Sequence, residues 1–130
     1  MNPKQTGDVE GGCHCGGVRF RIRLPESIRA LQCNCSICER KGFLHLILEP
    51  NAFTLLCGAE LLQTYTFGTH TAVHRFCTRC GIHPFYTPRS HPNKVDVNAY
   101  CLDHHLADHL PIDDFDGRNW EESYEKLGVS

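Results

Sequence analysis

The sequence lacks the long apolar run that a membrane-spanning helix needs. Its 130 residues contain no stretch of about 20 consecutive apolar residues, and the mean hydropathy is −0.34. Strong charge of one sign is also missing, because 13 Lys and Arg residues stand against 15 Asp and Glu residues. A net charge of −2 argues against nucleic acid as a partner, since nucleic-acid-binding proteins usually carry a basic face.

The first ten residues are polar and lack the apolar stretch of a secretory signal. We therefore expect a cytoplasmic protein, with no membrane partner. The length fits one domain of about 100–150 residues. We expect residues 1–10 to form a flexible lead and residues 11–130 to form a single domain.

Cysteine is the residue type in clear excess, with nine copies. An odd number of cysteines without a secretory signal argues against a disulfide framework. Cysteines one or two residues apart converge more readily on one metal ion than on a structural disulfide. Zinc is favoured over an iron–sulfur cluster because the familiar cluster spacings are missing, and mixed redox roles stay open as an alternative. The clustered cysteines are Cys13 and Cys15, then Cys33, Cys35 and Cys38, then Cys77 and Cys80.

These seven cysteines suffice for one site of four thiolates and a second site of three. The first and last pairs are each followed at once by glycine, which allows tight turns that aim backbone N–H groups at sulfur. Two such pairs from distant parts of the chain predict a closed structural zinc site. The central triple leaves one coordination position for another ligand, and catalytic zinc sites keep such a position. We therefore expect chemistry at the triple.

Seven short segments read as β-strands, which predicts a mainly β domain. Residues 18–24 alternate apolar and basic side chains with period two, and we expect their arginines to form a solvated face. Asn34 and Ser36 suit a tight turn within the cysteine triple. Residues 119–128 predict a short C-terminal helix ending at Gly128. The other expected strands cover residues 43–48, 53–57, 61–67, 72–76, 84–87 and 95–100.

Three motifs, in this order, resemble one known family. They are GGCHCGGVRF at residues 11–20, CNCSIC at 33–38 and the segment from Tyr65 to Gly81 with its Cys-x-x-Cys-Gly end. A later segment, residues 88–103, is similar to the family's C-terminal signature. Over residues 9–120 the chain resembles the glutathione-dependent formaldehyde-activating enzyme family, which also includes centromere protein V.

The resemblance implies a zinc-stapled β-tent fold with two zinc ions. It also implies condensation of formaldehyde with glutathione to S-(hydroxymethyl)glutathione, a carbon–sulfur lyase reaction run in reverse. By the same resemblance the structural zinc is held by Cys13, Cys15, Cys77 and Cys80, and the catalytic zinc by Cys33, Cys35 and Cys38.

The leading hypothesis is a zinc-dependent enzyme of the carbon–sulfur lyase type, acting on adducts of glutathione or another thiol with an aldehyde. The alternative is a non-catalytic zinc-stapled module that binds a protein or chromatin partner. A redox sensor that uses the cysteine triple is a third hypothesis. The edge strands of a small β domain are compatible with a homodimer.

Several residues outside the clusters are weaker candidates for the site. His45 is a candidate support for the second zinc, and His70 and His74 are candidate acids or bases, although a surface or hydrogen-bonded role is favoured for both. Arg89 either pairs with a substrate carboxylate or braces its own loop. The unclustered cysteines, Cys57 and Cys101, are expected to be buried thiols.

Overall fold

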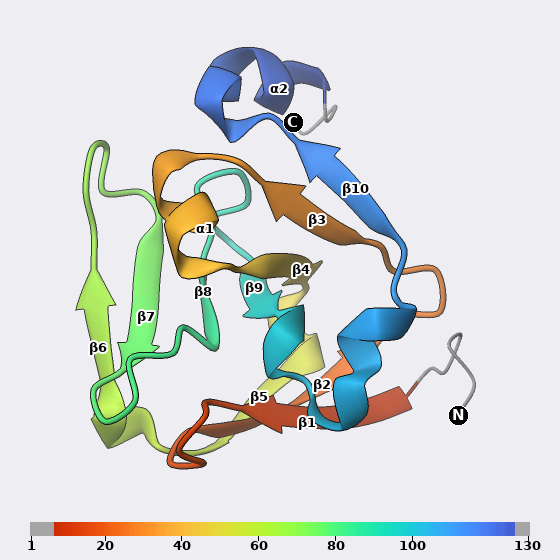
Figure 1. Cartoon of the computed structure of the whole chain (residues 1–130), viewed down its shortest axis with the longest axis vertical. Helices are drawn as coiled ribbons and strands as arrows, with labels where there is room; N and C mark the ends of the chain where they lie inside the picture. The colour runs from red at the N-terminus through yellow and green to blue at the C-terminus, as the bar shows by residue number, and fades with distance from the viewer. Residues whose placement is uncertain (1–6, 127–130) are drawn as a thin grey trace.

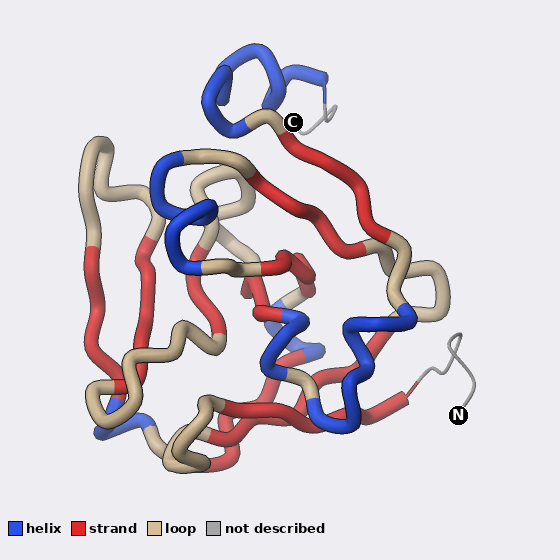
Figure 2. The backbone as a smooth tube through the Cα atoms, viewed as in Figure 1, coloured by secondary structure: helices blue, strands red, loops and turns tan. Residues whose placement is uncertain are grey.

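The computed structural model describes residues 7–126, which form two β-sheets connected by short helical turns (Figures 1 and 2). The smaller sheet has the strand order β1-β2-β5, with β1 at Gly7–Gly12, β2 at Arg19–Leu24 and β5 at Phe53–Cys57. The larger has the order β10-β3-β4-β9-β8-β7-β6. Its strands are β10 (Ile112–Phe115), β3 (Ala30–Cys33), β4 (Leu44–Leu48), β9 (Val95–Asn98), β8 (Phe85–Thr87), β7 (Val73–Cys77) and β6 (Leu62–Tyr65).

Helices are short and few among the described residues. Two are α-helices, α1 (Ser36–Lys41) and α2 (Trp120–Lys126), and η4 (Asp103–His109) is the longest of the 3-10 turns. Within residues 7–126, no helix is long and apolar enough to cross a membrane. The prediction of a mainly β fold with a short C-terminal helix is confirmed, whereas its expected stop at Gly128 lies outside the described residues.

The hydrophobic core joins the two sheets. In β2 the apolar side chains of Phe20, Ile22 and Leu24 are buried and the arginines between them are not, as the period-two alternation predicts. In β4, Leu44 and Leu46 belong to the same hydrophobic cluster. One face of each sheet thus supplies the core.

The expected flexible lead over residues 1–10 is wrong from residue 7 onward. Gly7–Gly12 form β1, which pairs antiparallel with β2, while residues 1–6 lie outside the described part of the chain. The register places Glu10 opposite Arg21, and Glu10 Oε2 accepts a hydrogen bond from Arg21 Nη2 at 3.3 Å. Pairing with acidic side chains of β1 therefore explains the exposed arginine face of β2.

Strands β3 and β10 and helix α1 were also not expected from the sequence. Strand β10 pairs parallel with β3, although about 80 residues separate them. Helix α1 begins at Ser36, where the sequence predicts only a tight turn. It ends at Gly42, whose left-handed conformation, with φ of 63°, is typical of glycine after a helix. Together β10 and α1 place the C-terminal segment near the cysteine triple.

The face of the larger sheet that points away from the core carries a row of mostly polar side chains. The register pairs His74 with Tyr86, Tyr86 with Asp96, and Asp96 with Ile47. Because side chains alternate along a strand, His45 lies on the same face of β4 as Ile47. These side chains line one side of the candidate site.

One ion pair connects η4 to the smaller sheet. Arg19 donates two hydrogen bonds to Asp103, at 3.1 Å to Oδ1 and 2.5 Å to Oδ2, and these hold the pKa of Asp103 below its usual 3.8. A depressed pKa stabilises the fold above pH 3.8, and this stability is lost as the pH falls through the folded-state value. We expect Asp103→Asn to cost about 0.5–1 kcal/mol at pH 7 and the difference to shrink below pH 4, measured by urea unfolding.

Asp113→Asn is the matched control. Asp113 also accepts two hydrogen bonds from an arginine, Arg29, but both side chains are at least half exposed. Water screens such a pair, so we expect a smaller loss than for Asp103→Asn. Equal losses of unfolding free energy in the two variants would contradict the expectation that partial burial strengthens the Arg19–Asp103 pair.

Candidate metal and substrate site

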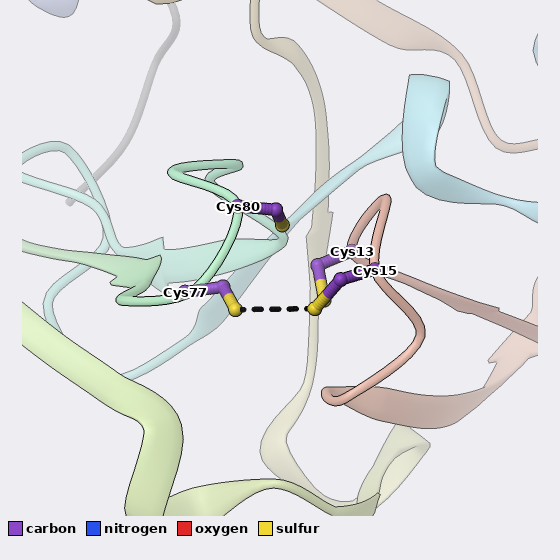
Figure 3. A group of neighbouring side chains, drawn as sticks. All are labelled: Cys13, Cys15, Cys77 and Cys80. Carbon is purple, nitrogen blue, oxygen red and sulfur yellow. Dashed lines mark hydrogen bonds between the residues drawn. The ribbon is translucent and has the colours of Figure 1, made fainter.

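Four cysteines meet where the turn after β1 faces the turn between β7 and β8 (Figure 3). Their sulfur atoms all lie within 4.8 Å of one another, with the Sγ atoms of Cys15 and Cys77 3.7 Å apart. Backbone N–H groups donate to this four-cysteine cluster, for example from Val18 to Cys13 Sγ at 3.3 Å. The members of the cluster are Cys13, Cys15, Cys77 and Cys80.

The closeness of these sulfur atoms makes their thiols titrate differently. Desolvation raises the pKa of Cys80, but backbone N–H groups and the neighbouring thiols lower it more strongly, to about 6. The N–H group of Gly17 lowers the pKa of Cys15, but desolvation and the neighbouring thiols raise it overall, to about 11. Four sulfur donors that resist ionising together suit a divalent cation, which offsets their charge. The four-cysteine cluster could therefore hold a metal ion.

A second cluster forms where β3 meets α1. The three-cysteine cluster consists of Cys33, Cys35 and Cys38, whose sulfur atoms also lie within 4.8 Å of one another. Cys33 ends β3, Cys35 caps α1 and Cys38 lies in its first turn. The Cys35 Sγ accepts a hydrogen bond from the Cys38 N–H at 3.4 Å. A single short segment thus supplies three sulfur donors, which could hold a second metal ion.

The three thiols of the three-cysteine cluster differ in pKa, because each one hydrogen-bonds to its neighbours. Hydrogen bonds from Cys33 and Cys38 lower the pKa of Cys35 to about 2. The hydrogen bond with Cys35 raises the pKa of Cys33 to about 11, and bonds to both neighbours raise that of Cys38. Among the described residues, no histidine nitrogen or carboxylate joins these three sulfur atoms within 4.8 Å.

The segment after β10 closes over the three-cysteine cluster. Arg118 donates from Nε to the Asn34 carbonyl at 3.1 Å and from Nη2 to Glu39 at 2.6 Å. Gly117 lies so close that a Cβ atom there would stand 2.5 Å from Cys33 Sγ. No local sequence pattern indicates this closure, because the contacts join residues about 80 positions apart.

A cavity of about 430 Å³ extends from the three-cysteine cluster across the face of the larger sheet that points away from the core. Its volume falls within the range of roughly 300–1,000 Å³ that is typical of small-molecule sites. All three cysteines line it, and apolar side chains such as Ile37 and Phe67 form part of its wall. Arg89 and Arg118, two positively charged residues, also line it. The cavity therefore combines sulfur ligands, apolar surface and positive charge.

The structure places His45 in this cavity beside Asp96. His45 Nδ1 lies 2.5 Å from Asp96 Oδ2, and the two side chains are 4% and 1% exposed. The hydroxyl group of Tyr86 lies 3.4 Å from the same ring nitrogen. Sequence reasoning proposed His45 as a support for the site but did not find Asp96, which the strand register supplies.

Of the two other candidate histidines, one lines the cavity and the other does not. His74 is buried, stacks on Tyr86 with ring centroids 4.7 Å apart, and lies 2.9 Å from Lys41 Nζ through Nδ1. Burial lowers the pKa of His74 to about 4 and the pKa of Lys41 to about 8. His70 is exposed, outside the cavity lining, and bonded to Thr66.

The remaining candidates from the sequence are Arg89, Cys57 and Cys101. The Arg89 guanidinium carbon lies 3.6 Å from the Trp120 ring centroid, and Arg89 donates to Glu121 of α2 at 3.4 Å. Arg89 therefore braces α2 while it lines the cavity. Cys57 is exposed rather than buried, because it stands at the end of an edge strand of the smaller sheet, whereas Cys101 is half-buried. Burial raises the pKa of Cys101 to about 12.

Three comparisons with known proteins agree with one another. The family model described as glutathione-dependent formaldehyde-activating enzyme matches residues 8–115. A protein of Halomonas elongata named "Putative glutathione-dependent formaldehyde-activating enzyme" is 38% identical over 106 residues, which cover 75% of this chain and 68% of that protein. The crystal structure of a Rhodobacter sphaeroides protein is similar with a TM-score of 0.71 and 35% identity, covering 80% of this chain and 99% of the other.

Proposed function

Because the chain belongs to the family of glutathione-dependent formaldehyde-activating enzymes, we propose that it is a zinc-dependent enzyme that joins a thiol to an aldehyde. The observation that carries this proposal is the three-cysteine cluster, whose members line a cavity together with two arginines. The prototype reaction is the addition of glutathione to formaldehyde, which gives S-(hydroxymethyl)glutathione. Because the reverse reaction breaks a carbon–sulfur bond, the activity would be that of a carbon–sulfur lyase.

The donor sets support two zinc ions with different roles. We assign a structural zinc to the four-cysteine cluster, because four sulfur ligands complete a tetrahedral site. We assign a catalytic zinc to the three-cysteine cluster, whose three ligands leave one position for a substrate group. When bound there, zinc would stabilise a thiol in its thiolate form at neutral pH.

The side chains of the cavity suit a peptide-like thiol. Glutathione carries two carboxylates, and the guanidinium groups of Arg89 and Arg118 line the cavity. Guanidinium groups bind carboxylates through paired hydrogen bonds. The apolar wall that includes Ile37 and Phe67 would limit access of water to the reacting sulfur. These residues would therefore bind and orient the thiol beside the three-cysteine cluster.

The Cys35→Ser variant tests the assignment of the second zinc. Serine also caps helices, so it keeps the bond to the Cys38 N–H while it removes one sulfur ligand. We expect two zinc ions per chain in the wild type, one at each cluster, and one in the folded variant, by elemental analysis. We also expect the variant to lose the acceleration of glutathione–formaldehyde exchange, measured by NMR.

Binding of the thiol is tested with two ligands that differ only at sulfur. We expect glutathione, but not S-methylglutathione, to change the visible absorption of protein loaded with Co²⁺ at the second site. Two zinc ions in Cys35→Ser would show that the ligand assignment is wrong. One zinc in the wild type, with no response to glutathione, would instead support the non-catalytic interaction module.

A further inference from the structure

The buried pair of His45 and Asp96 is not explained by packing alone. His45 Nδ1 and Asp96 Oδ2 are 2.5 Å apart, which leaves His45 Nε2 and Asp96 Oδ1 as the other polar atoms of the two side chains. Both are buried, and neither has a hydrogen-bond partner among residues 7–126. Such buried, unpaired atoms destabilise a fold and are uncommon in native proteins, so a ligand that pairs with them is a natural explanation.

The position of the pair connects it to the proposed chemistry. His45 and Asp96 line the same cavity as the three-cysteine cluster. They lie on neighbouring strands β4 and β9, on the face that points away from the core. Rigid sheet positions hold catalytic groups more exactly in place than loops do. A substrate between the cysteines and the sheet would therefore lie beside this pair.

Asp96 determines which nitrogen of His45 carries the proton. A carboxylate accepts hydrogen bonds, so it favours the ring form with a proton on Nδ1 and a free electron pair on Nε2. Three other polar groups surround the pair: Tyr86 beside Nδ1, His74 stacked on the Tyr86 ring, and Lys41 over the same ring at 4.3 Å. None of these donates to Nε2, which is therefore available to accept a proton.

His45 does not serve as a fourth ligand of the three-cysteine cluster in this arrangement. Its ring nitrogens do not join the three sulfur atoms within 4.8 Å of one another. In this arrangement neither ring nitrogen of His45 is therefore taken up as a ligand of the three-cysteine cluster.

We infer that His45 Nε2 takes the proton of the substrate thiol and delivers it to the aldehyde oxygen, with Asp96 as a positioning residue. This inference rests on the proposed function. The thiol S–H bond breaks and its proton moves to Nε2, while the sulfur electron pair forms a bond to the aldehyde carbon. The carbonyl π electrons move to oxygen, which takes the proton back from Nε2. One proton is carried, His45 ends as it began, and no further reactant is needed.

The test compares His45→Gln and Asp96→Asn with the control His83→Gln. His83 also has a buried ring nitrogen, Nδ1, without a hydrogen-bond partner in the described part of the chain, but it does not line the cavity. We expect His45→Gln to lower kcat for glutathione–formaldehyde exchange about 10²–10⁴-fold, with a KM for glutathione within a few-fold of wild type and an unchanged zinc content. The control should retain the wild-type rate. In His45→Ala, added imidazole should restore part of kcat, which a structural role would not produce.

A spectroscopic measurement tests the inference without relying on the rate. In ¹⁵N NMR spectra of the zinc-loaded wild type, we expect His45 to carry its proton on Nδ1 and the Nε2 signal to shift when glutathione is added. Asp96→Asn should lose this proton preference, and the His83 ring signals should not respond to glutathione. An unshifted Nε2 signal, or wild-type kcat in His45→Gln, would overturn the inference while leaving the proposed function intact. A wild-type protein that accelerates no exchange would overturn the proposed function, and the inference with it.

Discussion

Replacing Cys77 with serine is expected to leave the chain unfolded at 25 °C. Cys77 is fully buried at the end of β7, and its partner Cys15 lies on the turn that follows β1. The four-cysteine cluster therefore connects the smaller sheet to the larger one. Structural zinc contributes an apparent 10–16 kcal/mol, by an order-of-magnitude estimate from zinc-finger peptides, whereas whole domains are stable by only about 5–15 kcal/mol.

The expected loss is measured by circular dichroism and by zinc content. Cys77→Ser should show neither the β-sheet signal nor a cooperative transition in urea, and it should retain no zinc at the four-cysteine cluster. Cys57→Ser is the matched control, because Cys57 is exposed and belongs to neither cluster. The control should unfold at the wild-type urea concentration. A folded Cys77→Ser protein with the wild-type midpoint would contradict the stabilising role of the cluster.

The parts of the fold that local sequence pattern determines could be predicted. The alternation of Phe20, Ile22 and Leu24 with arginines identifies β2 and its buried face, because side chains alternate along a strand. The Cys-x-Cys and Cys-x-x-Cys spacings group the seven cysteines as the structure does. Within β2, and within each cysteine pair or triple, the residues that decide the outcome are near neighbours in the sequence, whereas the meeting of the two distant pairs follows from the need for four ligands.

The features that were missed depend on pairing between distant segments. Strand β1 is rich in glycine and has little strand propensity, but pairing with β2 and the contact of Glu10 with Arg21 stabilise it. The His45–Asp96 pair requires the register between β4 and β9, which joins positions 51 residues apart. Alternation assigns a face to each residue, but it does not say which residues meet across strands.

Helix α1 was missed for a different reason. Its six residues are too few for a helical periodicity to be recognised, and its cap is Cys35, whereas helices usually begin after Ser, Thr, Asp or Asn. The cysteine that is expected to bind metal thus also starts the helix. Gly42 at the end of α1 was the available signal for a helix in this segment.

The second large effect is expected from a residue that carries no functional group, Gly117. A Cβ atom at this position would stand 2.5 Å from Cys33 Sγ and 2.7 Å from Cys35 Cβ. Carbon and sulfur atoms do not approach so closely, so the three-cysteine cluster or the segment after β10 must move. The hydrogen bonds of Arg118 to Asn34 and Glu39 hold that segment in place, which leaves the cysteines to be displaced.

We therefore expect Gly117→Ala to weaken zinc binding at the three-cysteine cluster about 10–100-fold, as changes beside metal ligands typically do, and to reduce the exchange rate in parallel. Chelator competition measures the zinc affinity, and circular dichroism should show the wild-type fold. Gly7→Ala is the control: its φ of +104° strains an alanine, but a Cβ atom there meets nothing within 4 Å among residues 7–126. The control should lose stability and keep both zinc ions. If Gly117→Ala binds the second zinc as tightly as the wild type, the cluster can yield to the added methyl group and its geometry does not depend on this glycine.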